Sequence, residues 1–285
     1  MAKTQDLRRR IRSIRNTRQL TLAMKLVSAS KLRRAQERIL RSRPYAKKIA
    51  QVLASVAARS NPEEHPLFEQ RGASRVRIVV LTGDKGLCGS FNTAILRRAI
   101  TQAEEHAGSE VDFVAVGKRG RDYLKRFRHR VERDWVDIFR AVDFSVAVAI
   151  SRELMDAYTS RRVDRIYLVY NEFKSAMQAR PTTQQLLPVE PLDLPPAEAG
   201  EEYLYEPGAR ELLDSLLPHY VEQSVFQGLL ESVAAEHAAR MTAMDSASRN
   251  AGELIDSLTL TMNRVRQASI TTEIIEVVSG AEALG

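Results

Sequence analysis

The sequence predicts an α/β fold with added long helices: a central Rossmann-like α/β domain, and terminal helices that pair as an antiparallel, left-handed coiled coil. Apolar residues near both ends recur at alternating four- and three-residue intervals over many heptads. Between these ends, short runs of valine, isoleucine and leucine alternate with helical patterns, which favours a mostly parallel sheet with covering helices. The 285-residue chain is 44% hydrophobic, so it has enough apolar residues to fill such a core.

Changes in composition divide the chain into four parts. Residues 1–58 lack glycine and predict the N-terminal coiled-coil helix. Residues 70–190 predict the central α/β domain. Residues 191–208 hold four prolines and several acids, which is typical of a linker or an exposed flap. Residues 209–285 predict the C-terminal coiled-coil helix.

The N-terminal helix carries one long apolar seam. Its middle, from Arg18 to Ser28, is polar or small, so we expect this helix to contact more than one partner. Pro44 is expected to kink the helix or to break it locally. The seam consists of Leu7, Ile11, Ile14, Arg18, Thr21, Lys25, Ser28, Leu32, Ala35, Ile39, Ser42, Ala46, Ile49, Leu53 and Val56. A second stripe that faces elsewhere consists of Leu20, Ala23, Met24 and Val27.

The C-terminal helix carries a seam of the same period, which implies a left-handed supercoil. Pro218 is expected to interrupt the opening turns. Gly228 and Gly252 are tolerated inside the helix, each at about 1 kcal/mol relative to alanine. The seam consists of Phe226, Leu230, Val233, His237, Arg240, Met244, Ala247, Ala251, Leu254, Leu258, Thr261, Val265, Ala268, Thr272 and Ile275.

The C-terminal helix is expected to extend beyond its partner. If both helices are rooted on the central domain they run antiparallel, and the longer one extends past the shorter by about twenty residues. That overhang begins after Arg266, and residues 267–278 contain neither lysine nor arginine. An apolar helix tip of this kind needs a protein socket. We expect another protein to supply it.

The central part predicts strands at 76–81, 111–116 and 166–169, with a further edge strand at 184–189. Helical patterns lie between them at roughly 90–106, 118–128 and 143–160, and the stretch from Asn61 to Pro66 predicts a loop.

One glycine-rich loop could bind a phosphate. Residues Gly83–Asn92 follow a strand and open a helix, which is where phosphate loops lie. Their glycines are spaced three apart, so they match neither common nucleotide-binding pattern. The plainer interpretation is a tight turn that needs glycine dihedral angles.

No other pattern indicates a chemical site. Cys88 is the only cysteine, and a packed small residue is its simpler role, although a nucleophile at a helix N-terminus is the alternative. The five histidines show no metal-ligand spacing. The sequence therefore predicts no catalytic residue, no cofactor site and no metal site.

Positive charge is concentrated at the N-terminal end. Residues 1–48 contain sixteen lysines and arginines but only two acids, Asp6 and Glu37. Such asymmetry indicates an acidic partner. Anionic lipid and nucleic acid are alternatives, but no aromatic residue precedes Tyr45, so the arm lacks side chains on which bases could stack. An acidic protein surface is the favoured partner.

The sequence contains neither the apolar core of a signal peptide nor about eighteen consecutive apolar residues. We therefore expect a cytoplasmic protein without a transmembrane segment.

Several stretches together resemble the γ subunit of F-type ATP synthase. They are Ile11–Ala35, Gly83–Asn92, Glu236–Asp245 and Asn263–Glu273. The resemblance is very specific in the two helices and less specific in the middle loop. Two positions depart from the family pattern, Ala235 and Lys85, and neither alters the resemblance.

The resemblance implies a central rotor shaft that is not itself an enzyme. Its coiled coil would stand inside the ring of α and β subunits, and its α/β domain would rest with ε on the membrane c ring. Proton flow would turn the shaft, and the β subunits would carry the chemistry. The implied location is the cytoplasmic face of a bacterial membrane, as a peripheral protein.

The resemblance also implies contacts with the catalytic ring. Met24 and Lys25 match a pair near an acidic helix-turn-helix of β. The polar positions that contact β along the shaft correspond to Arg240, Gln267 and Thr271. Glu273 matches an acid near the upper bearing.

Overall fold

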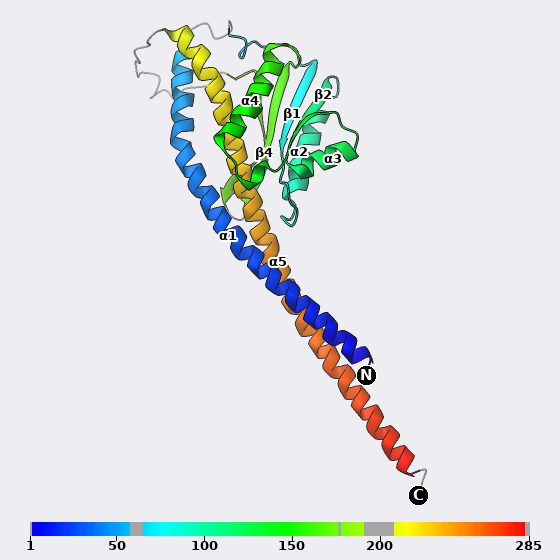
Figure 1. The fold of residues 1–285 in the computed structure, drawn as a ribbon. Coiled ribbons are helices and arrows are strands. Elements are labelled where there is room, and N and C mark those ends of the chain that lie inside the picture. The colour runs from blue at the N-terminus through cyan, green and yellow to red at the C-terminus, as the bar shows by residue number, and fades with distance from the viewer. Residues whose placement is uncertain (1, 58–64, 176–177, 191–207, 283–285) are drawn as a thin grey trace. The chain divides into compact units, whose positions relative to one another are not determined.

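The computed structural model describes residues 2–57, 65–175, 178–190 and 208–282. They fall into two compact units, one of residues 1–28 with 240–285 and one of residues 29–239. The long helices α1 (Ala2–Ala57) and α5 (Ala209–Glu282) each contribute to both units (Figure 1). The expected linker at 191–208 lies outside the described residues except for its last position, as does most of the expected loop at 61–66. The four-part division stays a prediction.

The α/β part of the second unit is built on a five-stranded sheet in the order β3-β2-β1-β4-β5. The strands β1 (Arg75–Leu81), β2 (Glu110–Val116), β3 (Val131–Trp135) and β4 (Arg165–Ser175) are parallel, and β5 (Gln178–Leu187) pairs antiparallel with β4. This sheet confirms the expected α/β fold. The antiparallel edge strand begins earlier than the expected 184–189.

Helices connect the parallel strands: α2 (Phe91–Glu104), α3 (Lys118–Arg126) and α4 (Phe144–Thr159), with a short 3-10 turn at Ile138–Arg140. The crossovers through α2 and α3 step in one direction along the sheet, whereas the crossover through α4 steps back across β2 and β1. Because such crossovers are right-handed, α4 covers the face opposite to α2 and α3. The central strand β1 is buried on both faces along almost its whole length.

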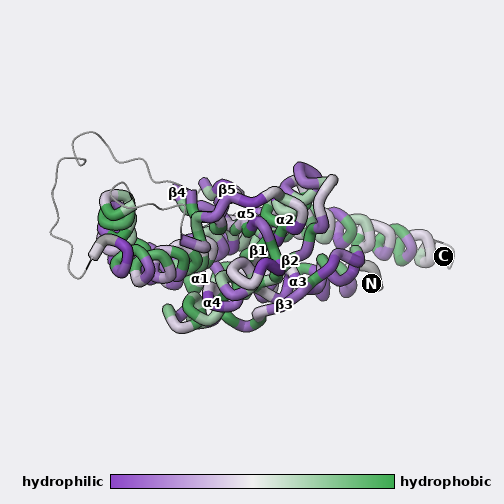
Figure 2. The backbone as a smooth tube through the Cα atoms, turned by 90° about the horizontal axis from the view of Figure 1, so that it is seen from above, coloured by the Kyte–Doolittle hydropathy of each residue, from purple (hydrophilic) through white to green (hydrophobic). Residues whose placement is uncertain are grey.

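Strand β3 was not expected from the sequence. Its five residues are Val-Glu-Arg-Asp-Trp, and the second and third are exposed. Figure 2 shows β3 and the neighbouring α3 as mostly hydrophilic. An edge strand half exposed to solvent lacks the continuous apolar run that made the other strands visible.

Neither proline breaks its helix, so the expected interruption at Pro218 was wrong, whereas a kink at Pro44 stays a prediction. Helix α1 continues through Pro44, and α5 continues through Pro218. A proline removes one backbone hydrogen bond. Around Pro218 the buried side chains of Leu213, Leu217 and Val221 hold the helix in place, and their packing offsets that loss.

The seam expected in α1 is confirmed in both units except at Arg18, which is exposed. In the first unit Ile11, Thr21 and Ser28 are buried. In the second unit the buried members are Leu32, Ala35, Ile39, Ile49, Leu53 and Val56. The second apolar stripe does face elsewhere, because Leu20 and Val27 are 66% and 56% exposed.

The two helices run antiparallel in the first unit. Lys25 pairs with Asp245, and Arg18 lies beside Gly252. Going from Lys25 back to Arg18 in α1 therefore corresponds to going from Asp245 forward to Gly252 in α5, so the chain directions are opposite. Ala2 lies sixteen residues before Arg18 and Ala268 sixteen after Gly252, so this register places Ala2 level with Ala268. Every residue from Ile270 to Ala281 is exposed, which confirms the expected overhang.

The seam expected in α5 is wrong on one flank. Met244, Ala251, Leu258 and Val265 lie at the interface as expected, but Leu254 is 54% exposed, whereas Ile255 is 9% exposed. Thr261 and Ala268 are exposed as well, and Met262 and Ser269 are partly buried instead. On a helix, positions three and four residues ahead lie on opposite sides of the same line, at about 60° and 40° from it. Helix α1 packs against the side that holds the positions four residues ahead, so Ile255 is buried and Leu254 is not.

Candidate functional site

The carboxyl ends of β1 and β4 meet at the place where sheets of this topology bind ligands. The loop after β1 is anchored there by backbone hydrogen bonds. The Thr82 N–H donates to the Val116 carbonyl oxygen at 2.8 Å, and the Gly120 N–H donates to Thr82 Oγ1 at 2.8 Å. Asp84 Oδ1 accepts from the backbone N–H groups of Lys118 at 2.9 Å and Asp137 at 3.0 Å. These bonds hold the loop between β1 and α3.

The Gly83–Asn92 segment is a tight turn, as the plainer interpretation of its glycines predicted. Gly89 has a φ of 55°, in the region that favours glycine. The side chain of Asn92 closes the turn: its Oδ1 accepts from the Gly83 N–H at 2.9 Å, and its Nδ2 donates to Cys88 Sγ at 3.3 Å. Cys88 is 2% exposed and packs inside this turn, as expected for a small core residue.

Helix α5 fills the crevice where a ligand would lie. An ideal Cβ on Gly228 would stand 2.9 Å from Leu168 Cδ2 and 3.3 Å from Leu81 Cδ1. Farther along α5, Glu236 Oε1 stands 2.9 Å from the ideal Cβ position of Gly83. A nucleotide phosphate approaching Gly83 would therefore meet the Glu236 carboxyl group. The phosphate-binding alternative for this loop has no room in the structure.

This contact joins two segments that the sequence singled out separately, Gly83–Asn92 and Glu236–Asp245. Gly83 and Glu236 are the first residues of the two segments, and they lie 153 positions apart in the chain. Periodicity placed Glu236 on a long helix but gave no sign of what that helix packs against. The contact partner was missed for that reason.

A buried carboxyl group lies nearby on α5. Glu231 is 8% exposed, and Gln227 Nε2 donates to its Oε1 at 2.7 Å. Burial raises the pKa of Glu231 above its ordinary value, and Glu172 raises it further, whereas hydrogen bonds from Gln227 and the Phe173 backbone lower it. Burial, together with Glu231 and Glu172, raises the pKa of Tyr170 to about 12. Glu231 lies inside the packing, whereas Tyr170 lines a cavity together with Arg98, Tyr167 and Tyr220.

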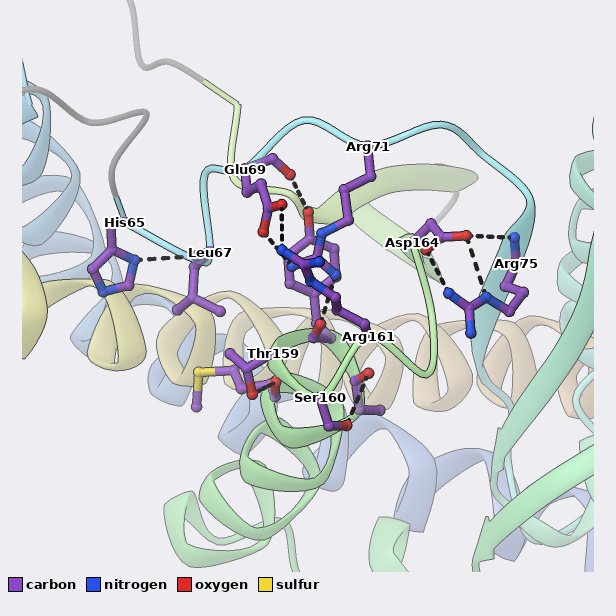
Figure 3. Close-up of polar contacts among 12 residues, drawn as sticks. His65, Leu67, Glu69, Arg71, Arg75, Thr159, Ser160, Arg161 and Asp164 are labelled. Atoms are coloured by element: carbon purple, nitrogen blue, oxygen red, sulfur yellow. Dashed lines mark hydrogen bonds and ion pairs between the residues drawn. The ribbon is translucent and has the colours of Figure 1, made fainter.

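The amino ends of β1 and β4 are held by a polar cluster (Figure 3). The Arg71 guanidinium lies 4.4 Å from the Tyr158 ring centroid, donates to the Tyr158 carbonyl oxygen at 2.8 Å and pairs with Glu69 at 2.7 Å. Arg75 pairs with Asp164 at 3.1 Å. This cluster fastens the segment before β1 to the end of α4, so its role is structural.

Histidines and acids do not gather into a metal site. Within the described ranges no group of three or more such side chains could hold a metal ion. His106 stacks edge-on against Tyr167, and His219 pairs with Glu222 at 3.0 Å. No helix in this described part of the chain is long and apolar enough to cross a membrane.

The six residues expected to contact a partner all lie on the first unit. Lys25 Nζ is 2.6 Å from Asp245 Oδ1, so this lysine also has a partner within the chain. Met24 and Arg240 are half-buried, whereas Gln267, Thr271 and Glu273 are exposed. Thr271 donates its hydroxyl hydrogen to the Gln267 carbonyl oxygen at 3.0 Å, one turn away on the same face.

Two exposed surfaces dominate this unit. Helix α1 carries six exposed arginines, Arg8, Arg9, Arg10, Arg12, Arg15 and Arg18, the last of which lies beside Gly252 of α5. The overhanging end of α5 carries exposed apolar side chains, which are Ile270, Ile274, Ile275, Val277 and Val278 at 44–72% exposure. Large exposed apolar surfaces of this kind mark protein contacts.

Comparison with known proteins agrees with this arrangement. The model of a family described as ATP synthase matches residues 3–284. The ATP synthase gamma chain of Geotalea uraniireducens is 45% identical over 286 residues, which cover 100% of this chain and 99% of that one. The corresponding protein of Solibacter usitatus is 49% identical over 282 residues, with 98% of each chain covered.

Solved structures are also similar. A chain in the central stalk and c-ring of Tetrahymena thermophila mitochondrial ATP synthase is 28% identical, with a TM-score of 0.62 over 80% of this chain and 99% of that one. A chain in the Euglena gracilis OSCP/F1/c-ring structure has the same fold, with a TM-score of 0.69 at 18% identity, covering 99% and 95% of the two chains.

Proposed function

The chain belongs to the ATP synthase gamma chain family, and from that membership we propose that it is the central rotor shaft of an F-type ATP synthase. As the shaft, it couples rotation of a membrane c ring, driven by protons, to conformational change in the catalytic ring of α and β subunits. The observation that carries the proposal is the overhanging end of α5. Its exposed apolar side chains, Ile274 and Val277 among them, need the enclosing socket that such a ring provides.

The shaft presents different chemistry at different heights. Apolar side chains cover the end of α5, exposed arginines lie on the stretch of α1 next to it, and an exposed apolar stripe with Leu20 and Val27 follows farther along α1. The α1 side of the shaft also differs from the α5 side, so the β subunits of the surrounding ring each meet a different surface. When the shaft turns, each β subunit meets a new surface of the shaft. The conformation that this subunit favours changes as a result.

The contacts with the catalytic ring follow from this placement. In the proposal Met24 and Lys25 face an acidic segment of β, which also suits the surrounding arginines. Gln267, Thr271 and Arg240 make polar contacts along the shaft, and Glu273 lies near the upper bearing. The shaft itself catalyses no reaction; ATP is made and hydrolysed on β.

The α/β domain is proposed to contact the ε subunit and the c ring. This places the protein at the cytoplasmic face of a bacterial membrane, as a peripheral subunit. Ion transport then belongs to the membrane sector, and this chain transmits its rotation.

Reconstitution tests the proposal. Purified chain is mixed with the cognate α and β subunits, and ATP hydrolysis and complex size are measured with and without it. We expect no hydrolysis by the chain alone, and a stable complex with strongly stimulated hydrolysis when all three are present. A mixture that neither assembles nor gains activity would contradict the proposal.

A salt titration of binding to duplex DNA and to RNA separates the alternative function. Tight binding that weakens steeply with salt would favour a nucleic-acid-binding role for the basic arm. The shaft proposal expects only weak, non-specific binding.

A further inference from the structure

Torque in the proposed shaft has to pass between the α/β domain and α5. Three residues of α5, spaced four apart, face the crevice at the carboxyl ends of β1 and β4: Gly228, Ser232 and Glu236. Residues at this spacing lie on one side of a helix. The three are defined here as the crevice stripe.

Gly228 allows the closest approach. Because an ideal Cβ there would stand 2.9 Å from Leu168 Cδ2 and 3.3 Å from Leu81 Cδ1, a larger residue would require these two leucine side chains to shift. Glycine inside a helix costs about 1 kcal/mol relative to alanine. The close packing of α5 on β1 and β4 accounts for its presence here.

Ser232 continues the hydrogen bonding of the sheet. Strand β1 pairs with β4 only as far as Val169, so the Asn171 N–H lies beyond the end of β1. Ser232 Oγ accepts from this N–H at 3.3 Å, and the serine is fully buried. Helix α5 therefore takes the place of the missing strand residue, which fixes its position along β4.

Glu236 is the third member. It is 4% exposed, and its carboxyl group stands directly over Gly83. Acidic side chains are rarely buried unless they have partners. Gly83 in turn is held by Asn92 at the start of α2, and the adjacent Asp84 holds the start of α3. The contact thus links α5 to two helices of the domain through one loop.

We propose that the crevice stripe is the joint that transmits torque between α5 and the α/β domain, with Glu236 as its positioning residue. The inference rests on the proposed rotor function. Turning α5 about its axis would move Glu236 off the loop and break the Ser232 hydrogen bond at the same time. The crevice in which other α/β folds bind ligands is therefore occupied by α5 and serves as a fixed contact between α5 and the domain.

The test uses the complete, ion-pumping complex in vesicles, with the ratio of ATP-driven ion uptake to ATP hydrolysis as its readout. Glu236→Ala is expected to lower this ratio several-fold while hydrolysis continues, and Glu236→Gln is expected to retain most of it. Glu222→Ala is the matched control, because Glu222 is equally buried on α5 but pairs with His219 instead of the loop. It should leave the ratio unchanged. A ratio for Glu236→Ala equal to that of Glu222→Ala would overturn the proposal.

If the Glu236→Ala variant does not assemble, a pair of substitutions that compensate for each other tests the same contact. Gly83→Ala adds a methyl group 2.9 Å from Glu236 Oε1 and should lower the ratio. Glu236→Asp shortens the opposing side chain, so the double variant should restore it. Failure of the double variant to restore coupling would contradict the joint. If the unaltered chain itself neither assembles nor stimulates hydrolysis, the rotor function fails instead, which distinguishes the two outcomes.

Discussion

Lys25 and Asp245 join the two helices of the first unit through an ion pair in which Nζ lies 2.6 Å from Oδ1. The two residues are 220 positions apart in the chain. Together with the contact between Arg18 and Gly252, this pair sets the antiparallel register and therefore the length of the unpaired end of α5. The hydrogen bond from Lys25, together with the nearby positive charges of Lys25 and Arg249, lowers the pKa of Asp245 below its ordinary value.

The first prediction concerns how the stability of the first unit changes as the pH is lowered. A carboxyl group whose pKa is lowered by folding stabilises the folded state above its unfolded pKa, and this contribution is lost as the pH falls through the folded value. Asp245→Asn should therefore lower the melting temperature at neutral pH and have little effect in strong acid. Circular dichroism of the helical signal measures it, with Asp256→Asn, at an exposed position of the same helix, as the control. Equal effects of both variants at neutral pH would contradict the prediction.

The second prediction tests the register of the paired helices. Ile255 is 9% exposed and Leu254 is 54% exposed, although the two are adjacent in α5. Ile255→Ala should destabilise the first unit by about 2 kcal/mol, because it leaves a cavity in the interface. Leu254→Ala should change stability by no more than about 0.5 kcal/mol. Denaturant unfolding of both variants, followed by circular dichroism, compares them directly. The reverse order of effects would restore the seam expected from the sequence.

The third prediction has the opposite dependence on pH. The pKa of Glu231 is raised by burial, so its contribution to stability is present below the unfolded pKa and is lost as the pH rises through the folded value. Glu231→Gln keeps an oxygen that can accept from Gln227 Nε2 and removes the charge that forms at higher pH. The variant should be more stable than the unaltered chain at neutral and alkaline pH, and the difference should disappear in acid. Thermal unfolding over a pH series measures this. The exposed Glu253→Gln should show no such trend.

The fourth prediction concerns the overhanging end of α5. Because every residue from Ile270 to Ala281 is exposed, a chain that ends after Ser269 loses little internal packing among the described residues. It should fold with an unchanged melting temperature but assemble more weakly with the α and β subunits. Calorimetry and complex size on a gel-filtration column measure the two properties. A shortened chain that fails to fold would contradict the overhang, and one that assembles with full strength would show that the apolar end needs no socket.

Periodicity predicted the long helices, the buried strands and the overhang, because each depends on a repeating pattern of apolar side chains. Periodicity could not show which side of α5 faces α1. The apolar stripe of α5 is wider than its contact with α1, and it includes both Leu254 and Ile255. Strand β3 escaped because its residues are mostly charged.

The site was harder to predict than the fold. The Gly83–Asn92 loop was visible in the sequence as a turn, but its partner Glu236 belongs to a helix whose place over the crevice depends on packing in three dimensions. The Lys25–Asp245 pair likewise depends on the register of two segments at opposite ends of the chain.

The most direct test of the rotor function is to watch the chain turn. Gly108 has open space around its ideal Cβ position, so Gly108→Cys provides a labelling site, and Cys88→Ser removes the native thiol. A probe is attached there, and the reconstituted complex is immobilised through its β subunits. A rotor shaft should carry the probe round in one direction while ATP is hydrolysed and stop when ATP is removed. Sustained hydrolysis with a stationary probe on an intact complex would contradict it.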